Sequence, residues 1–255
     1  MQRVDSDIVD LIVTSPPYDS LRAYKGFQFD FELVAVEMYR IIRPGGTLVW
    51  IVADETKQFC ESLSSFKQLL FMVEVAGFNL LDTMVYAKKN GPAPYPGLMR
   101  YAPWFEYMFV LTKGRPVTFN PIKDIPTQSG AGKRQSGSSA RQVDGSTVKT
   151  GEYISSQFRA RSNVWIYDTG FNKDTKDKIA LSHPARFPEA LARDHILSWS
   201  NSGDMVYDPF LGSGTTAKMS HETTRRWSGS EISTEYCNLA IQRLKDCGVE
   251  ARIDS

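Results

Sequence analysis

The chain has 255 residues, of which 42% are hydrophobic, and a formal net charge of +1 at pH 7. This length is sufficient for one sizeable core, so one domain with an inserted segment is the simplest organisation. The three cysteines and the lack of CxxC or HExxH spacings argue against a disulfide framework and a metal site. We expect a cytoplasmic protein that does not enter the membrane, since we find neither a signal peptide nor an apolar run of spanning length.

Apolar periodicity predicts alternating strands and helices along the first part of the chain. Strands are expected at 8–13, 47–53, 79–87 and 104–112, and helices at 31–42 and 60–76. In the second helix, the side chains expected to face the core are those of Phe66, Leu69, Leu70 and Val73. The alternation favours an α/β fold around a mostly parallel sheet.

A polar segment interrupts this pattern after Asn120. Between Lys123 and Arg161 the chain is rich in Gly, Ser, Gln and Thr, and it carries seven basic and three acidic residues. Such a segment is typical either of a flexible, solvated loop or of an arm that contacts phosphates. Regular structure is expected to resume with strands at 163–167, 204–207 and 226–229 and helices at 188–199 and 234–246. We place His195 on the surface of the first of these helices.

The stretch Thr14-Ser15-Pro16-Pro17-Tyr18 follows the first predicted strand. The two prolines have no N–H to donate, so they end the strand and fix Ser15 at its carboxyl edge, where open α/β sheets bind ligands. A hydroxyl, proline carbonyls and an aromatic ring can grip a flat ring that bears an exocyclic amine. The same residue types are also common in ordinary turns.

A second stretch, Asp208 to Thr216 (DPFLGSGTT), predicts a strand, a tight turn and the start of a helix. Gly212 and Gly214 permit close approach of the backbone to a ligand, and a helix N-terminus favours a carboxylate or phosphate. Glu231 follows the next strand, at the position that binds ribose hydroxyls in Rossmann-like halves. The pattern indicates a nucleoside-bearing ligand with an anionic tail, with an ordinary βα turn as the alternative. Because it is neither GxGxxG nor GxxxxGK[ST], it disfavours nicotinamide cofactors and nucleoside triphosphates.

Three stretches together resemble the β group of amino-methylating DNA methyltransferases. TSPPY resembles their catalytic motif, DPFLGSGTT with the downstream GSE resembles their S-adenosylmethionine motif, and HPARFPEAL resembles a further cofactor motif. The resemblance implies a Rossmann-like class I methyltransferase fold in permuted chain order. This is a mostly parallel twisted sheet with one antiparallel strand and helices on both faces. It also implies a catalytic half at 1–119, a target-recognition segment at 120–162 and a cofactor-binding half at 163–255.

The resemblance also implies the roles of individual residues. The target base is held by Ser15, Pro16, Pro17 and Tyr18. The S-adenosyl-L-methionine pocket is formed by Asp208, Pro209, Phe210, Gly212, Ser213, Gly214, Thr215, Thr216, Glu231, Ile232, His183, Phe187 and Pro188. Within this pocket Glu231 binds the ribose and Ile232 touches the adenine. The basic residues expected to contact DNA are Arg22, Lys25, Lys133, Arg134 and Arg141.

The implied reaction is methylation of the 4-amino group of cytosine, in a base flipped out of double-stranded DNA. In this family a serine at the first motif position favours cytosine, and the 6-amino group of adenine is the alternative. Related sheets methylate RNA bases or protein glutamine, but their motif more often begins with asparagine. Methylation at carbon 5 of cytosine would require a nucleophilic cysteine, and no cysteine lies near either motif in sequence.

A further alternative is a nucleic-acid-binding protein with weak or no cofactor binding. Family members usually carry another strand, with an acid near the cofactor adenine, before the catalytic strand. Here only a few residues precede the catalytic strand, so either that strand is missing or Asp5 and Asp7 take its part. The resemblance leaves open a homodimer and a cognate restriction endonuclease of a restriction-modification pair.

Overall fold

The computed structural model describes residues 1, 3–17, 30–93, 99–135, 137, 139–149, 151–170, 175, 177 and 188–253. The chain forms two compact units, one made of residues 1–120 and 163–255 and the other of residues 121–162. Five residues predicted to act in the site lie outside the described residues, namely Tyr18, Arg22, Lys25, His183 and Phe187.

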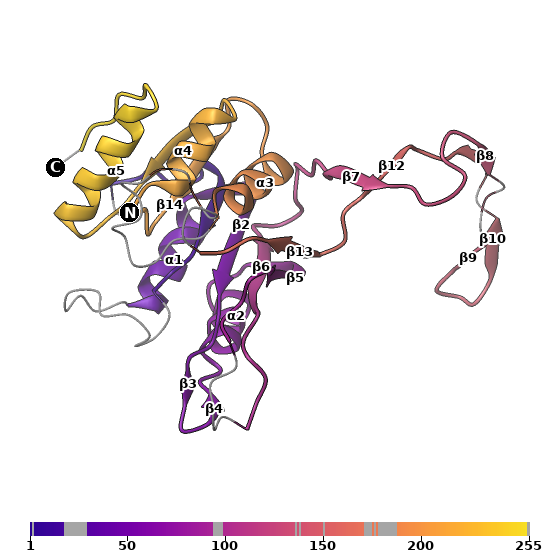
Figure 1. The fold of residues 1–255 in the computed structure, drawn as a ribbon, viewed down its shortest axis with the longest axis horizontal. Coiled ribbons are helices and arrows are strands. Elements are labelled where there is room, and N and C mark those ends of the chain that lie inside the picture. The colour runs from indigo at the N-terminus through magenta and orange to yellow at the C-terminus, as the bar shows by residue number, and fades with distance from the viewer. Residues whose placement is uncertain are drawn as a thin grey trace. The chain divides into compact units, whose positions relative to one another are not determined.

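The first unit is built on one seven-stranded sheet, with the strand order β13-β5-β6-β2-β1-β14-β15 (Figure 1). In chain order the strands are β1 (Val9–Thr14), β2 (Ile42–Val52), β5 (Asn79–Lys88), β6 (Phe105–Thr112), β13 (Val164–Tyr167), β14 (Met205–Asp208) and β15 (Arg226–Gly229). Strand β6 pairs antiparallel with both of its neighbours, β2 and β5, and all other neighbouring strands of the sheet are parallel. The predicted mostly parallel sheet with one antiparallel strand is confirmed.

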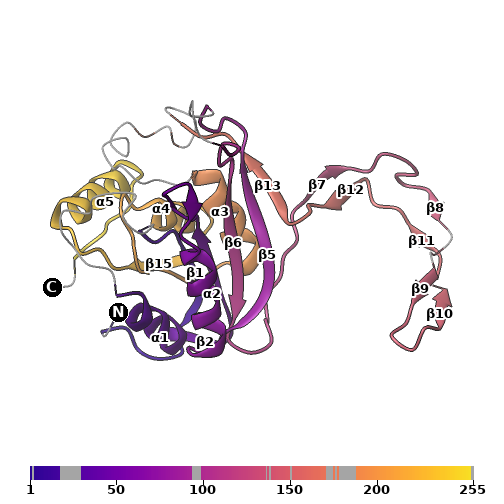
Figure 2. The ribbon, with the colours of Figure 1, turned by 90° about the horizontal axis from the view of Figure 1, so that it is seen from below.

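Helices cover both faces of this sheet, as Figures 1 and 2 show, with α1 and α2 on one face and α3, α4 and α5 on the other. They are α1 (Phe31–Ile41), α2 (Ser64–Glu74), α3 (Glu189–Trp199), α4 (Thr215–Glu222) and α5 (Thr234–Asp246). Two of these helices have an N-cap residue whose side chain accepts a hydrogen bond from the backbone, Asp30 for α1 and Ser233 for α5. A small hairpin of β3 (Thr56–Lys57) and β4 (Cys60–Glu61) follows β2. In the described part of the chain, no helix combines the length and apolar character needed to cross a membrane.

A large core cluster lies between the sheet and the pair α1 and α2, around Trp50 and Met72. The predicted inward face of α2 is partly wrong, because Phe66 and Leu70 are exposed. The cause is a polar contact at the start of the helix. Asp54 accepts hydrogen bonds from the Ser65 N–H (3.0 Å) and the Ser65 Oγ (2.6 Å). This contact turns Ser65, and Met72 two turns later, toward the sheet.

The prediction that His195 lies on the helix surface is wrong. Its side chain is buried, its ring centroid is 4.6 Å from that of Trp165, and its Nε2 is 3.1 Å from Met108 Sδ. Helix α3 packs on both β1 and α4, so most of its circumference is covered. Burial lowers the pKa of His195 to about 3, so the imidazole is neutral at physiological pH and serves the core.

The second unit consists of nested antiparallel strand pairs. They are β7 (Lys123–Pro126) with β12 (Phe158–Ala160), β8 (Arg134–Gln135) with β11 (Tyr153–Ile154), and β9 (Ser139–Arg141) with β10 (Thr147–Lys149). Composition indicated a loop here and missed this pairing. No residue described in this unit is buried, so backbone hydrogen bonds and ion pairs such as Arg161 with Asp124 hold it, rather than an apolar core.

Candidate active site and cofactor turn

The two stretches singled out in the sequence meet at one edge of the sheet. Strands β1 and β14 are neighbours and run parallel, with Ile12 opposite Tyr207. Their carboxyl ends therefore lie side by side, and the Thr14 Oγ1 donates a hydrogen bond to Asp208 Oδ1 at 2.6 Å. The strand that leads into Ser15 and the strand that leads into the glycine turn are thus joined directly.

Asp208 holds this junction together. Its carboxylate also accepts hydrogen bonds from the Phe210 N–H (3.0 Å) and from the Thr216 Oγ1 (2.8 Å), and the residue is only 2% exposed. Burial raises the pKa of Asp208 to about 6, and the hydrogen bonds from Thr14, Phe210 and Thr216 partly oppose that rise. The carboxylate therefore links β1, the glycine turn and the start of α4.

The glycine turn has the backbone of a close ligand cradle. Gly212 and Gly214 have φ angles of +50° and +79°, in the left-handed region that favours glycine. A Cβ on Gly214 would also lie 3.2 Å from the Ala240 Cβ of α5. Gly214 is the N-cap of α4 and no side chain caps the helix there, so its first N–H groups suit an anion. These features fit the carboxylate end of an S-adenosylmethionine molecule.

Glu231 lies beside this turn. Strand β15 is parallel to β14, with Gly229 opposite Asp208, so the chain leaves both strands at the same edge. Glu231 Oε2 accepts a hydrogen bond from the Gly212 N–H and its Oε1 accepts one from the Ser233 N–H, both at 2.9 Å. A carboxylate has about four acceptor positions, so the contacts with described residues leave two for ligand hydroxyls. Next to it, Ile232 is exposed and offers an apolar surface.

Some of the other predicted site residues are among the described residues and some are not. Ser15 and Pro17 are half-buried and Pro16 is buried, immediately after Thr14. Of the three site residues predicted in the third motif, Pro188 is the one described, and it is buried at the start of α3. The ring of Phe210 lies 6.2 Å from that of Trp50, which anchors the turn to the core.

The suggestion that Asp5 and Asp7 serve the cofactor pocket is not supported. Both precede the amino end of β1, whereas Asp208 and Glu231 lie at the carboxyl edge of the sheet. Asp7 is occupied by an ion pair with Lys113, whose Nζ is 2.7 Å from Asp7 Oδ1. These two acids belong to the opposite edge of the first unit.

The basic side chains predicted to contact DNA are accessible where they are described. Lys133, Arg134 and Arg141 belong to the second unit and all three are exposed. Arg134 pairs with Glu152 at 2.7 Å, but both side chains are highly exposed, so this pair exchanges readily with solvent and other anions.

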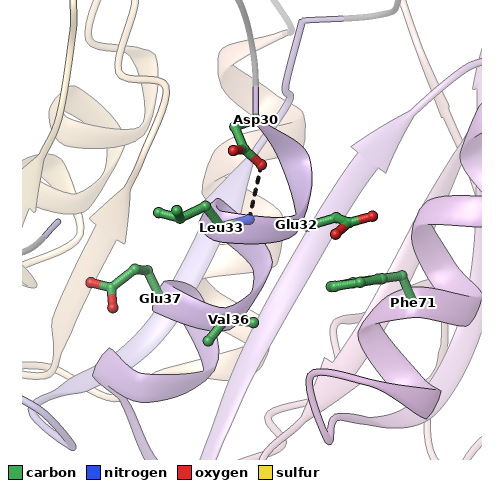
Figure 3. Close-up of a pocket in the computed structure, with 6 residues that line it drawn as sticks. All are labelled: Asp30, Glu32, Leu33, Val36, Glu37 and Phe71. Carbon is green, nitrogen blue, oxygen red and sulfur yellow. Dashed lines mark hydrogen bonds between the residues drawn. The ribbon is translucent and has the colours of Figure 1, made fainter.

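A hollow of about 390 Å³ lies away from this edge, between α1 and α2 (Figure 3). It is lined by Asp30, Glu32, Leu33, Val36, Glu37 and Phe71. None of these residues comes from the ends of β1, β14 or β15, and three are acidic. The hollow is therefore separate from both motifs, and its acidic lining is unsuited to nucleic acid.

Two residues that shape the site were given no role from the sequence. Thr14 could have been singled out because it is the first residue of the TSPPY stretch. Arg243 donates to the Ser213 carbonyl and to the Thr215 Oγ1. In the sequence, Arg243 could have been noticed as a charged residue on the predicted apolar face of the last helix, three positions after Ala240.

Comparisons with known proteins agree on one family. A family model described as DNA methylase, whose name joins N6 and N4 enzymes, matches residues 9–242. The orphan methyltransferase M.BamHII of Bacillus amyloliquefaciens is 48% identical over 239 residues, covering 93% of this chain and 89% of that protein.

Solved structures show the same fold. The cytosine-N4-specific PvuII DNA methyltransferase matches with a TM-score of 0.69 at 18% identity, covering 99% of this chain and 84% of that chain. M1.HpyAVI, solved as its SAM complex, matches with a TM-score of 0.59 at 22% identity, covering 95% of this chain and 90% of that chain.

Proposed function

The chain belongs to the DNA methylase family, whose cofactor is S-adenosylmethionine, and from this premise we propose that it methylates the 4-amino group of cytosine in DNA. The observation that carries the proposal is the junction of the two motifs. Thr14, next to Ser15, is hydrogen-bonded to Asp208, which begins the glycine turn. An acceptor amine held at one motif would therefore be close to a cofactor held at the other.

The cofactor half of the proposal uses residues of the turn and of the end of β15. The N–H groups at the start of α4 would bind the carboxylate of the cofactor, and Glu231 would accept hydrogen bonds from the ribose hydroxyls. The exposed Ile232 would contact the adenine. When bound, S-adenosylmethionine supplies a methyl group already activated on a sulfonium.

The acceptor half uses Ser15, Pro16, Pro17 and Tyr18. An exocyclic amine is a weak nucleophile while its lone pair is delocalised into the base ring. Hydrogen bonds from the amine to the Ser15 hydroxyl and the Pro16 carbonyl would favour a tetrahedral nitrogen with a free lone pair. Tyr18 would stack on the base, which must leave the duplex to reach this edge. The main task of these residues is alignment of the amine.

The choice of cytosine rests on Ser15 within the family pattern, and adenine's 6-amino group is the second candidate. A serine hydroxyl can both accept from an amine and donate to a ring nitrogen, so its chemistry suits either base. The family model joins both activities, and the PvuII enzyme, at 18% identity, supports the fold alone.

Mass spectrometry of nucleosides tests the target base. DNA from cells that express the protein should contain 4-methylcytosine, and DNA from cells that express Ser15→Ala should contain much less. A product that is wholly 6-methyladenine would overturn the base and leave the cofactor assignment intact. Calorimetry with S-adenosylmethionine tests the non-enzyme alternative, which predicts no saturable heat.

Double-stranded DNA is the partner that the family implies, and the exposed basic residues of the second unit are our candidates for contacting its phosphates. The Bacillus amyloliquefaciens relative is named an orphan methyltransferase, so this comparison lends no support to a cognate restriction endonuclease. The described residues likewise lend none to a homodimer.

A further inference from the structure

Arg243 of α5 is the most deeply buried arginine among the described residues, at 1% exposure. Arginine is almost never buried in this way unless its donors are satisfied. Its Nη1 donates to the Ser213 carbonyl at 2.9 Å and to the Thr215 Oγ1 at 3.0 Å. These two acceptors flank Gly214, so one planar group bonds both sides of the glycine turn.

The rest of the guanidinium faces two carboxylates. Its Nε donates to Asp177 Oδ2 at 2.8 Å and its Nη2 donates to Glu189. Lys218 of α4, at 7% exposure, donates to the same two carboxylates at 2.7 and 3.0 Å. The two cations share these two carboxylates, and a third, exposed carboxylate, Glu222, lies 3.9 Å from Lys218 Nζ. The cluster connects α3, α4 and α5 next to the turn.

A buried ion cluster is weak evidence for stability, because desolvation of the charges offsets much of their attraction. A role in geometry suits the position of Arg243 better. Gly212 and Gly214 have left-handed backbones, and glycine leaves such a conformation easily unless neighbours hold it. Helix α5 supplies two neighbours on one face, Ala240 packed against Gly214 and Arg243 bonded to the residues around it.

We propose that Arg243 is a positioning residue for the cofactor. Its guanidinium fixes the Ser213 carbonyl and the Thr215 hydroxyl, so that the N–H groups of the turn and of the start of α4 keep a common direction toward the ligand. Its effect is exerted through the turn. The proposal rests on the proposed function, because it takes S-adenosylmethionine as the ligand of this turn.

Arg243→Met and Lys218→Met form a matched pair for the test. Each removes one cation from the same pair of carboxylates, but only the Arg243 side chain donates to the turn. Calorimetry with S-adenosylmethionine is carried out well below the melting temperature of both variants. Arg243→Met should weaken cofactor binding by about tenfold or more, while Lys218→Met should change it by less than about threefold despite a similar loss of Tm.

Steady-state kinetics separates positioning from a general loss of structure. In Arg243→Met the KM for the cofactor should rise with its Kd, while kcat at saturating cofactor should fall by less than about threefold. Equal weakening of cofactor binding in both variants, or wild-type affinity in Arg243→Met, would overturn the proposal.

Arg243→Lys keeps the test open if Arg243→Met does not fold. Lysine retains the charge but has a single ammonium in place of the planar fork, so it cannot serve the turn and both carboxylates in the same geometry. We expect a folded protein with intermediate affinity. Wild-type affinity in Arg243→Lys, or failure of both variants to fold, would make Arg243 a residue of stability only. A wild-type protein that gives no heat with S-adenosylmethionine would instead refute the proposed function itself.

Discussion

Thr14 and Asp208 are 194 positions apart in the chain, and the Thr14 Oγ1 lies 2.6 Å from Asp208 Oδ1. Both side chains are buried, so this hydrogen bond is shielded from water. It fixes the end of β1 against the start of the glycine turn. A methyl transfer that depends on alignment should be sensitive to such a bond, because small displacements of reacting groups can cost large factors in rate.

Thr14→Val tests this relationship, because valine keeps the shape and removes the hydroxyl. We expect a loss of about 1–2 kcal/mol of stability in urea, since one acceptor position of Asp208 loses its donor. We also expect kcat to fall more than cofactor affinity does. Thr112→Val is the control. Thr112 is also buried, but it lies at the end of β6, and its hydroxyl donates to the Gly114 carbonyl at 2.8 Å instead of joining the two motifs. If both variants kept wild-type kcat, the bond would have no part in alignment.

Asp208 predicts a pH dependence of stability. Burial raises its pKa in the folded protein to about 6, above the value of 3.8 for an unperturbed side chain. The folded state therefore binds this proton more tightly than the unfolded state, and the stability it contributes is present below pH 4 and is lost as the pH rises through 6. The full difference is roughly 3 kcal/mol.

Asp208→Asn removes this titration while its amide can still accept from Thr14 and the Phe210 N–H. Denaturant unfolding of both proteins from pH 4 to 7 should show the variant gaining stability relative to wild type as the pH rises. A constant difference between the two proteins across this range would mean that Asp208 does not titrate there.

The order and type of the main elements could be predicted because their signals are local. Helix α5 runs over the predicted residues 234–246, and its start follows from Ser233, which accepts from the Tyr236 N–H as an N-cap. The glycine turn was likewise recognisable, since Gly212 and Gly214 occupy left-handed conformations that few other residues adopt.

Features that depend on distant partners could not be predicted. His195 is buried because Trp165 and Met108 lie against it, and neither is near it in sequence. The face of α2 depends on Asp54, ten or more positions before the residues it orients. The strand pairs of the second unit rest on backbone hydrogen bonds, which leave no apolar pattern to detect.

Tyr18 provides a prediction from the catalytic motif alone, because it lies outside the described residues. If its ring stacks on the flipped base, Tyr18→Phe should keep most activity and Tyr18→Ala should lose most of it. Stacking of a base on an aromatic ring is worth roughly 1–3 kcal/mol. Methylation rates of the two variants on one DNA substrate measure this. Equal and near-complete loss in both would indicate an essential hydroxyl.

The second unit should bind DNA through phosphates, because its basic side chains are exposed and it has no buried residue among those described. Replacing Lys133, Arg134 and Arg141 with alanine should weaken binding to every DNA sequence alike. It should also reduce the slope of log K against the logarithm of the salt concentration by about 3 at most. The matched control removes three exposed basic residues of the first unit, Lys67, Arg193 and Lys245. Titrations of labelled DNA at several salt concentrations compare the two triple variants. Contact with phosphates predicts a large change in slope for the first and a small one for the second, whereas equal slopes would show that net charge alone governs binding.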